Sequence, residues 1–282
     1  MKLLYMIKDR ILIYALGIPI WLFLIWKGEF YFTLFILICT VLALGEFYSI
    51  TENNGAQPLR WMGMVSSVFI ADYYYRRPDI ILHEMQDGVI AIGGIILIII
   101  LTCIWELFSE KENPGQNISA TLAGILFIPV LLGTAIDLRQ FDDWAGTQLT
   151  MTLVLAIWAC DTVAFILGTL FGTKKIFPSI SPKKSWIGSI SGFIASLGVF
   201  IAFHKQGWLG DYFSLKDAIV FGVITGFFGQ IGDFLESSLK RDAGVKDSGT
   251  LLAGHGGVLD RFDSLIFATP LTYLYVHFLM HY

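Results

Sequence analysis

The stretch GVIAIGGIILIIILTCIW, residues 88–105, carries no charged side chain over its whole length. A helix of about 20 apolar residues crosses the roughly 30 Å hydrocarbon core of a bilayer. Similar runs recur along the chain and are too long and continuous for the strands of a membrane barrel. The sequence therefore predicts an all-α, polytopic integral membrane protein with about nine spans. They cover about residues 11–26, 30–50, 61–75, 88–105, 118–137, 148–171, 187–203, 217–239 and 264–282.

The composition supports a membrane protein and excludes other classes. Hydrophobic residues make up 55% of the 282 residues and charged residues only 15%, against about a quarter charged in soluble domains. One soluble core of this size cannot bury so many apolar side chains. The net charge of −4 gives no basic excess for nucleic-acid binding. The odd count of three cysteines, all in apolar runs, indicates buried thiols and not a disulfide framework or a metal site.

Lysine and arginine predict the orientation, because cytoplasmic loops carry the excess. With the N-terminus inside, the inner segments hold thirteen of the 19 basic residues and the outer segments six. Eight of the 19 lie in two inner loops of the C-terminal half, at about 172–186 and 240–261. We therefore expect residues 1–147 to form an N-terminal region of about five spans, and residues 148–282 to form the catalytic region.

The eighth predicted span ends in a polar stripe. Asp233, Glu236, Ser237 and Lys240 follow at i, i+3, i+4 and i+7, which places carboxylate, hydroxyl and ammonium groups on one face of a helix. Such a face can hold a metal and a phosphate side by side. The alternative is an interfacial helix end with an ion pair and a lysine that reaches toward the headgroups.

A glycine-rich segment with Gly254, His255, Gly256 and Gly257 leads into the last predicted span. Glycines let backbone N–H groups approach an anion closely. Asp260 and Asp263 follow at i and i+3, and their oxygens suit a hard cation such as Mg²⁺. Capping of the helix N-terminus is the alternative role for these carboxylates.

A second basic loop and an intramembrane carboxylate are two further candidate site features. Lys183, Lys184 and Ser185 follow Pro182 in the other basic loop, where they can hold phosphate oxygens or simply anchor the chain at the surface. Asp161 lies near the middle of the sixth predicted span, where an ionisable group is costly and indicates function.

These motifs resemble those of phosphatidate cytidylyltransferases, also called CDP-diacylglycerol synthases. The resemblance rests on SSLKRDAGVKDSGTLLAGHGGVLDRFD at 237–263, together with DTVAF at 161–165 and SPKKSW at 181–186, and covers roughly residues 158–264. The chain departs from the family pattern at Ile187, where the family commonly has Glu, and at Ala253, where it has Pro or Gly. Ile187 leaves no carboxylate at that position for metal or substrate binding.

The resemblance implies Mg²⁺-dependent transfer of a cytidylyl group from CTP to phosphatidic acid, giving CDP-diacylglycerol and pyrophosphate. It implies a homodimer and allows a second cation. With the orientation argued from lysine and arginine, we expect the protein in the inner membrane with the site facing the cytosol. Asp233 and Asp260 would hold the metal, with Asp263 as a further ligand, and Lys184 and Lys240 would act with them in catalysis. The expected substrate-binding residues are Lys183, Ser185, Ser237, Arg241, Lys246, His255 and Asp161.

Two other functions remain open from the residues alone. Intramembrane carboxylates and glycine-interrupted helices also mark transporters of anionic substrates, although no internal repeat is visible. A CTP-dependent enzyme acting on an isoprenoid phosphate or a polyprenol would need the same groups, and its products would distinguish it, since a kinase releases CDP and a cytidylyltransferase releases pyrophosphate.

Overall fold

The computed structural model describes residues 17–76, 84–251 and 256–280, with side chains for all of these except 84–88. Within these ranges all regular structure is helical, and the one pairing of extended backbone joins Lys175 to Ser185. A first helix covers Gly17–Lys27. The others are α2 (Glu29–Asn53), α3 (Arg60–Arg76), α4 (Glu84–Ser109), α5 (Pro114–Ile125), η2 (Leu126–Val130), α6 (Leu131–Gln140), α7 (Ala145–Phe171), α8 (Trp186–Lys205), α9 (Leu215–Val223), η3 (Ile224–Phe228), α10 (Gly229–Asp242), α11 (Leu259–Leu274) and η4 (Tyr275–Leu279).

Six of these helical stretches are long and apolar enough to cross a membrane, which confirms the all-α membrane class. They correspond to the predicted spans at 30–50, 88–105, 118–137, 148–171, 187–203 and 217–239. The described parts of the other three predicted spans are also helical, but α3 has only 17 residues and α11 begins with charged residues. The total of nine, and the domain boundary at residue 147, remain predictions.

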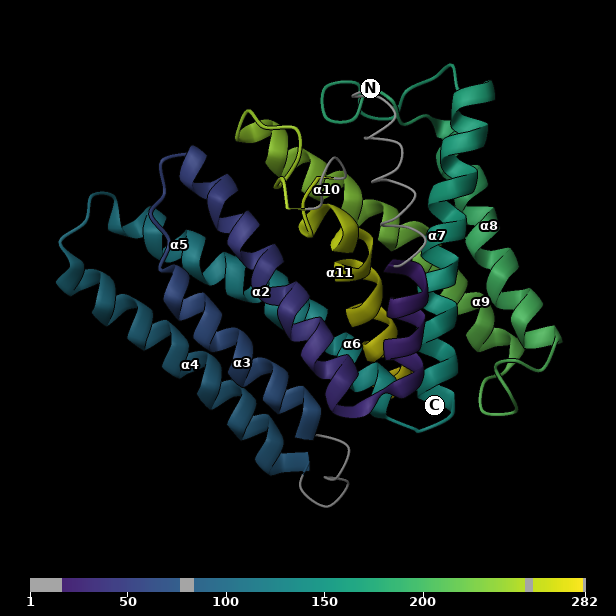
Figure 1. Ribbon diagram of the computed structural model, residues 1–282, viewed down its shortest axis with the longest axis horizontal. Coiled ribbons are helices and arrows are strands. Elements are labelled where there is room, and N and C mark those ends of the chain that lie inside the picture. Colours follow the sequence, from purple (N-terminus) through teal and green to yellow (C-terminus); the bar gives the residue numbers. More distant parts are fainter. Residues whose placement is uncertain (1–16, 77–83, 252–255, 281–282) are drawn as a thin grey trace.

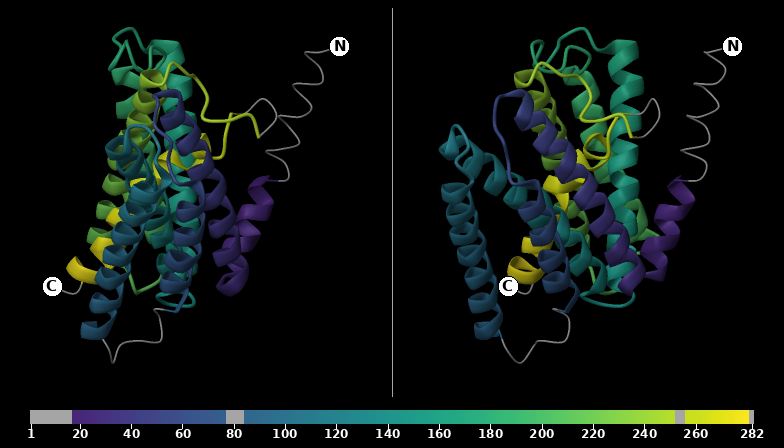
Figure 2. Two further views of the ribbon diagram at one scale, coloured as in Figure 1. Left: turned by 90° about the vertical axis from the view of Figure 1, so that its left-hand side faces the viewer. Right: turned by 60° about the vertical axis from the view of Figure 1, so that its left-hand side comes forward.

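The helices lie side by side in a bundle, with α4 and α3 at one edge and α8 and α9 at the other (Figures 1 and 2). Successive helices run up and down, so the ends of α2, α4, α7 and α10 lie toward one end of the bundle. Two of the long stretches contain a π-helical turn, η2 in 114–140 and η3 in 215–242. Pro129 lies in η2, where its missing N–H disrupts the regular ladder.

The close packing of α7 on α8 depends on glycine. A Cβ on Gly188 would lie 2.7 Å from the Ala164 carbonyl oxygen, and one on Gly192 would lie 2.7 Å from that of Cys160. Small residues let helices approach in a membrane, where apolar burial gives no net drive for association. The backbones of α7 and α8 therefore meet directly, and α8 starts beside the end of α7.

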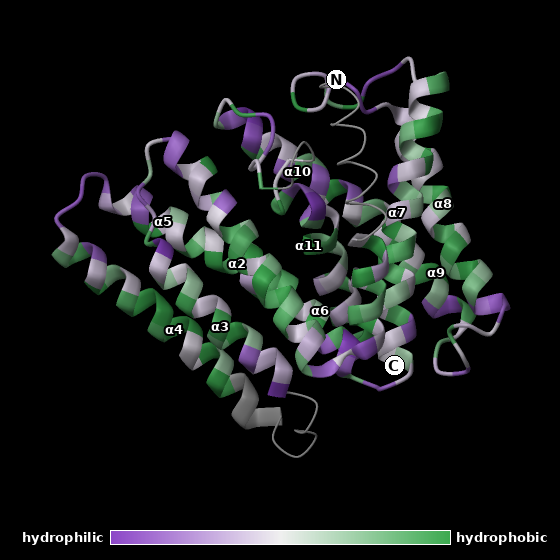
Figure 3. Ribbon diagram, viewed as in Figure 1, coloured by the Kyte–Doolittle hydropathy of each residue, from purple (hydrophilic) through white to green (hydrophobic). Residues whose placement is uncertain are grey.

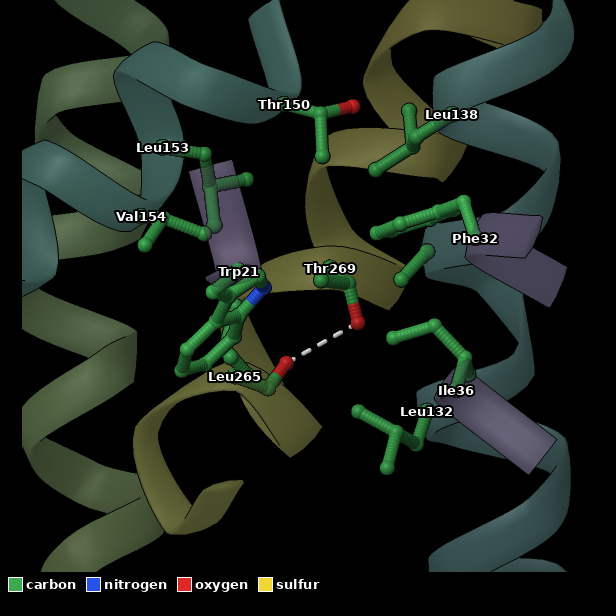
Figure 4. Close-up of a pocket in the computed structure, with 11 residues that line it drawn as sticks. Trp21, Phe32, Ile36, Leu132, Leu138, Thr150, Leu153, Val154, Leu265 and Thr269 are labelled. Carbon is green, nitrogen blue, oxygen red and sulfur yellow. Dashed lines mark hydrogen bonds between the residues drawn. The ribbon is translucent and has the colours of Figure 1, made fainter. Parts of the chain in front are cut away.

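Apolar residues cover the middle of the bundle and polar residues gather at its ends (Figure 3). Side chains from α2, α6, α7 and α11 also enclose a small apolar pocket beside Trp21 (Figure 4). The Trp21 ring stacks on Phe262 at 5.0 Å between centroids, so the first turn of α11 packs against the N-terminal helices. Cys39 and Cys160 are buried, but Cys103 is exposed on α4, where the prediction of burial was wrong because α4 buries little of its surface.

Helix α4 is tied to its neighbours by a buried polar network. Asn117 is fully buried, and its Nδ2 donates to Glu106 Oε1 at 2.5 Å and to the Glu112 carbonyl at 2.9 Å. Its Oδ1 accepts from the Gln57 N–H at 2.6 Å. Buried polar groups are costly without partners, so this network fixes α4 and the α2–α3 connection on α5.

Replacing Asn117 by alanine should destabilise the protein by about 2–3 kcal/mol, because Glu106 and the Gln57 N–H lose their buried partner. Thermal unfolding in detergent measures the change. Gln116→Ala is the matched control, since Gln116 is exposed and donates one hydrogen bond to the Asn54 carbonyl. Equal stability of the two variants would contradict this role of the network.

Candidate active site

Several predicted site residues lie in the C-terminal half of α7, on α10 and at the starts of α8 and α11. The ends of α7 and α10 and the start of α8 lie toward the top of Figure 1. Gly232 permits α10 and α11 to approach, because a Cβ there would collide with the backbone carbonyl of Asp263. The polar face of α10 is thereby placed against the first turn of α11. Residues from both predicted motif loops are brought together at this junction.

Lys184 and Asp233 form an ion pair. Both side chains are partly exposed, at 31% and 24%. The Lys184 ammonium also lies over the Phe234 ring, 4.5 Å from its centroid, and Ser237 Oγ donates to Asp233 Oδ1 at 3.4 Å. Because both groups remain accessible, the lysine can bind a substrate phosphate in place of the carboxylate, and the carboxylate can bind a metal ion in place of the lysine.

Ser185 has a clear structural role. Its hydroxyl caps α8 by accepting from the Gly188 N–H at 3.3 Å, and the residue is only 1% exposed. The cap fixes the start of α8 and with it the position of Lys184. The expected contact of Ser185 with substrate remains a prediction.

Lys240 lies deeper, between two carboxylates. It pairs with Glu236 one turn earlier on α10 and with Asp260 Oδ1, at 2.5 Å, and is 8% exposed. Breaking a buried ion pair leaves an uncompensated charge, so the three side chains depend on one another. In this arrangement Lys240 holds Asp260 in place, and its predicted contact with the reacting groups stays a prediction.

The second oxygen of Asp260 accepts two backbone N–H groups. Asp260 Oδ2 lies 2.7 Å from the Gly257 nitrogen and 3.1 Å from the Ser248 nitrogen. Gly256 has φ +80° and leaves no room for a side chain beside this carboxylate. Burial alone would raise the pKa of Asp260, which precedes the predicted span at 264–282, but the hydrogen bonds from Lys240 and Gly257 outweigh burial and lower the pKa. Gly256 thus lies against an anion of the protein itself, Asp260.

A second group of carboxylates lies beside this pair. Asp161, Asp233 and Asp263 interact electrostatically with one another and with Lys184. Asp263 Oδ1 accepts from the Ser264 N–H at 2.6 Å. Hard oxygen donors of this kind fit Mg²⁺. Among the described residues, however, no three Asp, Glu, His or Cys side chains form a ready metal cage, so a cation here would need oxygens from substrate as well.

The basic residues of the two loops fall into two groups. Arg241 joins the loops, with Nε donating to the Ile180 carbonyl at 3.1 Å and Nη1 to the Val245 carbonyl at 2.9 Å. Lys183 and Lys246 are exposed and available to anions. His255 and Ala253 lie outside the described residues, and Ile187 is 43% exposed at the start of α8.

One site residue was missed from the sequence. Glu46 of α2 reaches the start of α11, where Oε1 accepts from the Val258 N–H at 2.9 Å and Oε2 accepts from the Leu259 N–H at 2.8 Å. Oε2 also accepts from Ser248 Oγ at 2.8 Å. The available signal was an ionisable side chain inside a predicted span, the same signal that singled out Asp161.

Carboxylates and basic groups gathered in a membrane bundle are the groups that a membrane enzyme acting on phosphates uses. Comparison with known proteins gives the family. The chain belongs to the Cytidylyltransferase family, whose sequence profile matches residues 8–279. The resemblance seen in the motifs is therefore confirmed over nearly the whole chain.

Individual relatives agree with this assignment. The chain is 31% identical over 299 residues to the phosphatidate cytidylyltransferase of Synechocystis sp., covering 96% of this chain and 97% of the relative. It is 30% identical over 267 residues to the phosphatidate cytidylyltransferase of Bacillus subtilis, covering 94% and 96%. A chloroplastic phosphatidate cytidylyltransferase of Arabidopsis thaliana is 31% identical over 284 residues, covering 88% of this chain and 66% of the relative.

Replacing Lys240 by methionine should cost about 3 kcal/mol of stability, because Glu236 and Asp260 would be left as unpaired buried carboxylates. Thermal unfolding in detergent detects the loss. Lys246→Met removes the same charge from an exposed position and should change stability by less than about 0.5 kcal/mol. A Lys240 variant as stable as the Lys246 variant would refute the buried triad.

Proposed function

We propose that this protein transfers the cytidylyl group of CTP to phosphatidic acid, giving CDP-diacylglycerol and pyrophosphate. The observation that carries the proposal is the accessible Lys184–Asp233 ion pair in a membrane bundle, with Asp161 and Asp263 near enough to interact with it electrostatically. A water-soluble nucleotide and a lipid headgroup can meet at such a place. Relatives named phosphatidate cytidylyltransferase, similar over nearly their full length, support the substrate assignment.

The reaction requires that the two phosphate groups are positioned and that their negative charge is neutralised. A phosphate oxygen of phosphatidic acid attacks the α-phosphorus of CTP, and the bond from this phosphorus to the bridging oxygen of the β-phosphate breaks. Pyrophosphate leaves with that bonding electron pair. The attacking phosphate monoester is already anionic at neutral pH, so no strong general base is required.

The chain's basic groups neutralise the phosphates in this proposal. Lys184 exchanges its partner Asp233 for phosphate oxygens when substrate binds, and its ammonium lies over the Phe234 ring beside this carboxylate. Exposed Lys183 and Lys246 extend the basic surface toward the triphosphate and the lipid phosphate. Arg241 is held by the two loop carbonyls and contributes charge from a fixed position.

Magnesium is the cofactor that we propose. Asp233 and Asp263 would hold the ion, with Asp161 nearby, while both oxygens of Asp260 are engaged by Lys240 and backbone N–H groups. When bound, Mg²⁺ supplies neutralisation of the charge that develops on the transferring and leaving phosphates. The predicted role of Asp260 as a metal ligand stays a prediction, and its present hydrogen bonds hold the α10–α11 junction.

We also propose that the protein lies in the inner membrane with the site facing the cytosol, as a homodimer. The orientation rests on the excess of lysine and arginine in the segments that adjoin the site. Inside-out membrane vesicles, in which added CTP reaches the cytosolic face, should show activity without detergent. Activity confined to right-side-out vesicles would contradict this orientation.

Purified protein with phosphatidic acid, Mg²⁺ and CTP labelled at the α-phosphorus should carry label into the lipid phase with one pyrophosphate per lipid. Omission of Mg²⁺ or phosphatidic acid should abolish the transfer. CDP release without labelled lipid would indicate a kinase. Uptake of an anion into proteoliposomes without CTP would indicate a transporter.

Asp233→Asn should lower kcat about 100-fold or more, because it removes a charge from the metal and from Lys184. Asp242→Asn is the matched control on the same helix, since Asp242 is exposed and only accepts a hydrogen bond from Asn54 at 2.9 Å. Initial rates over a Mg²⁺ titration measure both variants. Full activity of Asp233→Asn with unchanged Mg²⁺ dependence would overturn the ligand assignment.

A further inference from the structure

Glu46 is a carboxylate within an apolar span, yet it serves the loop before α11. Helix α2 extends over Glu29–Asn53, more than 200 residues before Leu259 in sequence. The three donors around Glu46 belong to Ser248, Val258 and Leu259, so both ends of the segment from 248 to 259 are tied to one side chain.

The surrounding backbone approaches the Glu46 carboxylate closely at two glycines. A Cβ added to Gly249 would lie 2.5 Å from Glu46 Oε1, and a Cβ added to Gly257 would collide with Oε2. These two glycines therefore permit the backbone at residues 249 and 257 to approach the Glu46 carboxylate closely. At both glycines the anion that the backbone approaches is a side chain of the protein itself.

Glu46 also supplies hydrogen-bond acceptors to the N-terminus of α11. The first N–H groups of a helix have no partner within it, and the N-cap residue of α11, Val258, provides no side-chain acceptor. Glu46 accepts the N–H of Val258 and of Leu259, and its negative charge opposes the positive end of the helix dipole. The cap of α11 is thus contributed by another helix.

The same contacts determine where Asp260 lies. Ser248 donates its hydroxyl to Glu46 and its backbone N–H to Asp260, so one residue connects the two carboxylates. Asp260 sits in the first turn of α11 and in turn holds Lys240. A shift of the α11 start would move Asp260 and Asp263 together.

We propose that Glu46 is a positioning residue for cytidylyl transfer: it caps α11 from α2 and ties Ser248 to the start of α11, thereby placing Asp260 and Asp263 for the reaction. This inference rests on the proposed function. By this proposal the N-terminal helices both cross the membrane and position active-site residues.

Glu46→Gln tests the proposal with little change in shape. The amide retains one acceptor oxygen and replaces the other by a donor, so the variant must lose one of the two helix N–H bonds in either orientation. Glu52→Gln is the matched control, because Glu52 lies on the same helix and pairs with Arg60 at the surface, where both side chains are about 40% exposed. Ser248→Ala removes one donor and keeps the carboxylate.

The first readout is kinetic. Glu46→Gln should lower kcat about 10- to 100-fold with the KM for CTP within about threefold, because misplacement of reacting groups by even 1 Å costs rate more than ground-state binding. Ser248→Ala should show a smaller loss in the same direction, and Glu52→Gln should stay within about twofold of the parent. Equal kcat for the Glu46 and Glu52 variants would overturn the proposal.

The second readout is independent of substrate. Hydrogen exchange of the peptide covering residues 256–262 should be at least about tenfold faster in Glu46→Gln than in Glu52→Gln. Unchanged exchange would overturn the capping role. If the parent protein proves inactive toward CTP and phosphatidic acid, the proposed function fails, and this exchange measurement alone decides whether Glu46 holds the loop. Should Glu46→Gln not fold, the Ser248→Ala exchange and kinetics decide in its place.

Discussion

The site depends on the pairing of buried charge where α10 meets α11. Lys240 lies between Glu236 and Asp260, and Asp260 also receives two backbone N–H groups. Charges removed from water are tolerated only when they are paired and hydrogen-bonded. These pairings therefore fix the relative positions of α10 and α11, the helices that carry Asp233 and Asp263.

The two halves of the chain meet at the same place. Trp21 stacks on Phe262, and Glu46 caps the helix that carries Asp260 and Asp263. In a bilayer, apolar surfaces gain little from leaving lipid for protein, so close packing at small residues and polar contacts must hold the helices together. Glycines on α8 and α10 permit the close packing, and polar side chains on α2, α5, α10 and α11 supply the polar contacts.

Hydropathy was enough to predict the class, because a bilayer forces long apolar helices and leaves few alternatives. The Ser237–Asp263 motif likewise pointed to the residues that converge. The burial of Lys240 could not be predicted, since the i, i+4 spacing from Glu236 suits an exposed pair equally well. Glu46 carried the signal of an intramembrane acid, but its partners lie about 200 residues away and only the tertiary structure brings them together.

The most direct test of the role of Glu46 is a double-mutant cycle between Glu46 and Ser248, in which kcat/KM for phosphatidic acid is measured. If the two residues act as one clamp on the start of α11, Ser248→Ala should have much less effect in the Glu46→Gln background than in the parent, with a coupling of about 1 kcal/mol or more, that is about fivefold. Effects that simply multiply would show that α2 and the 248–259 loop act independently, and would contradict the account.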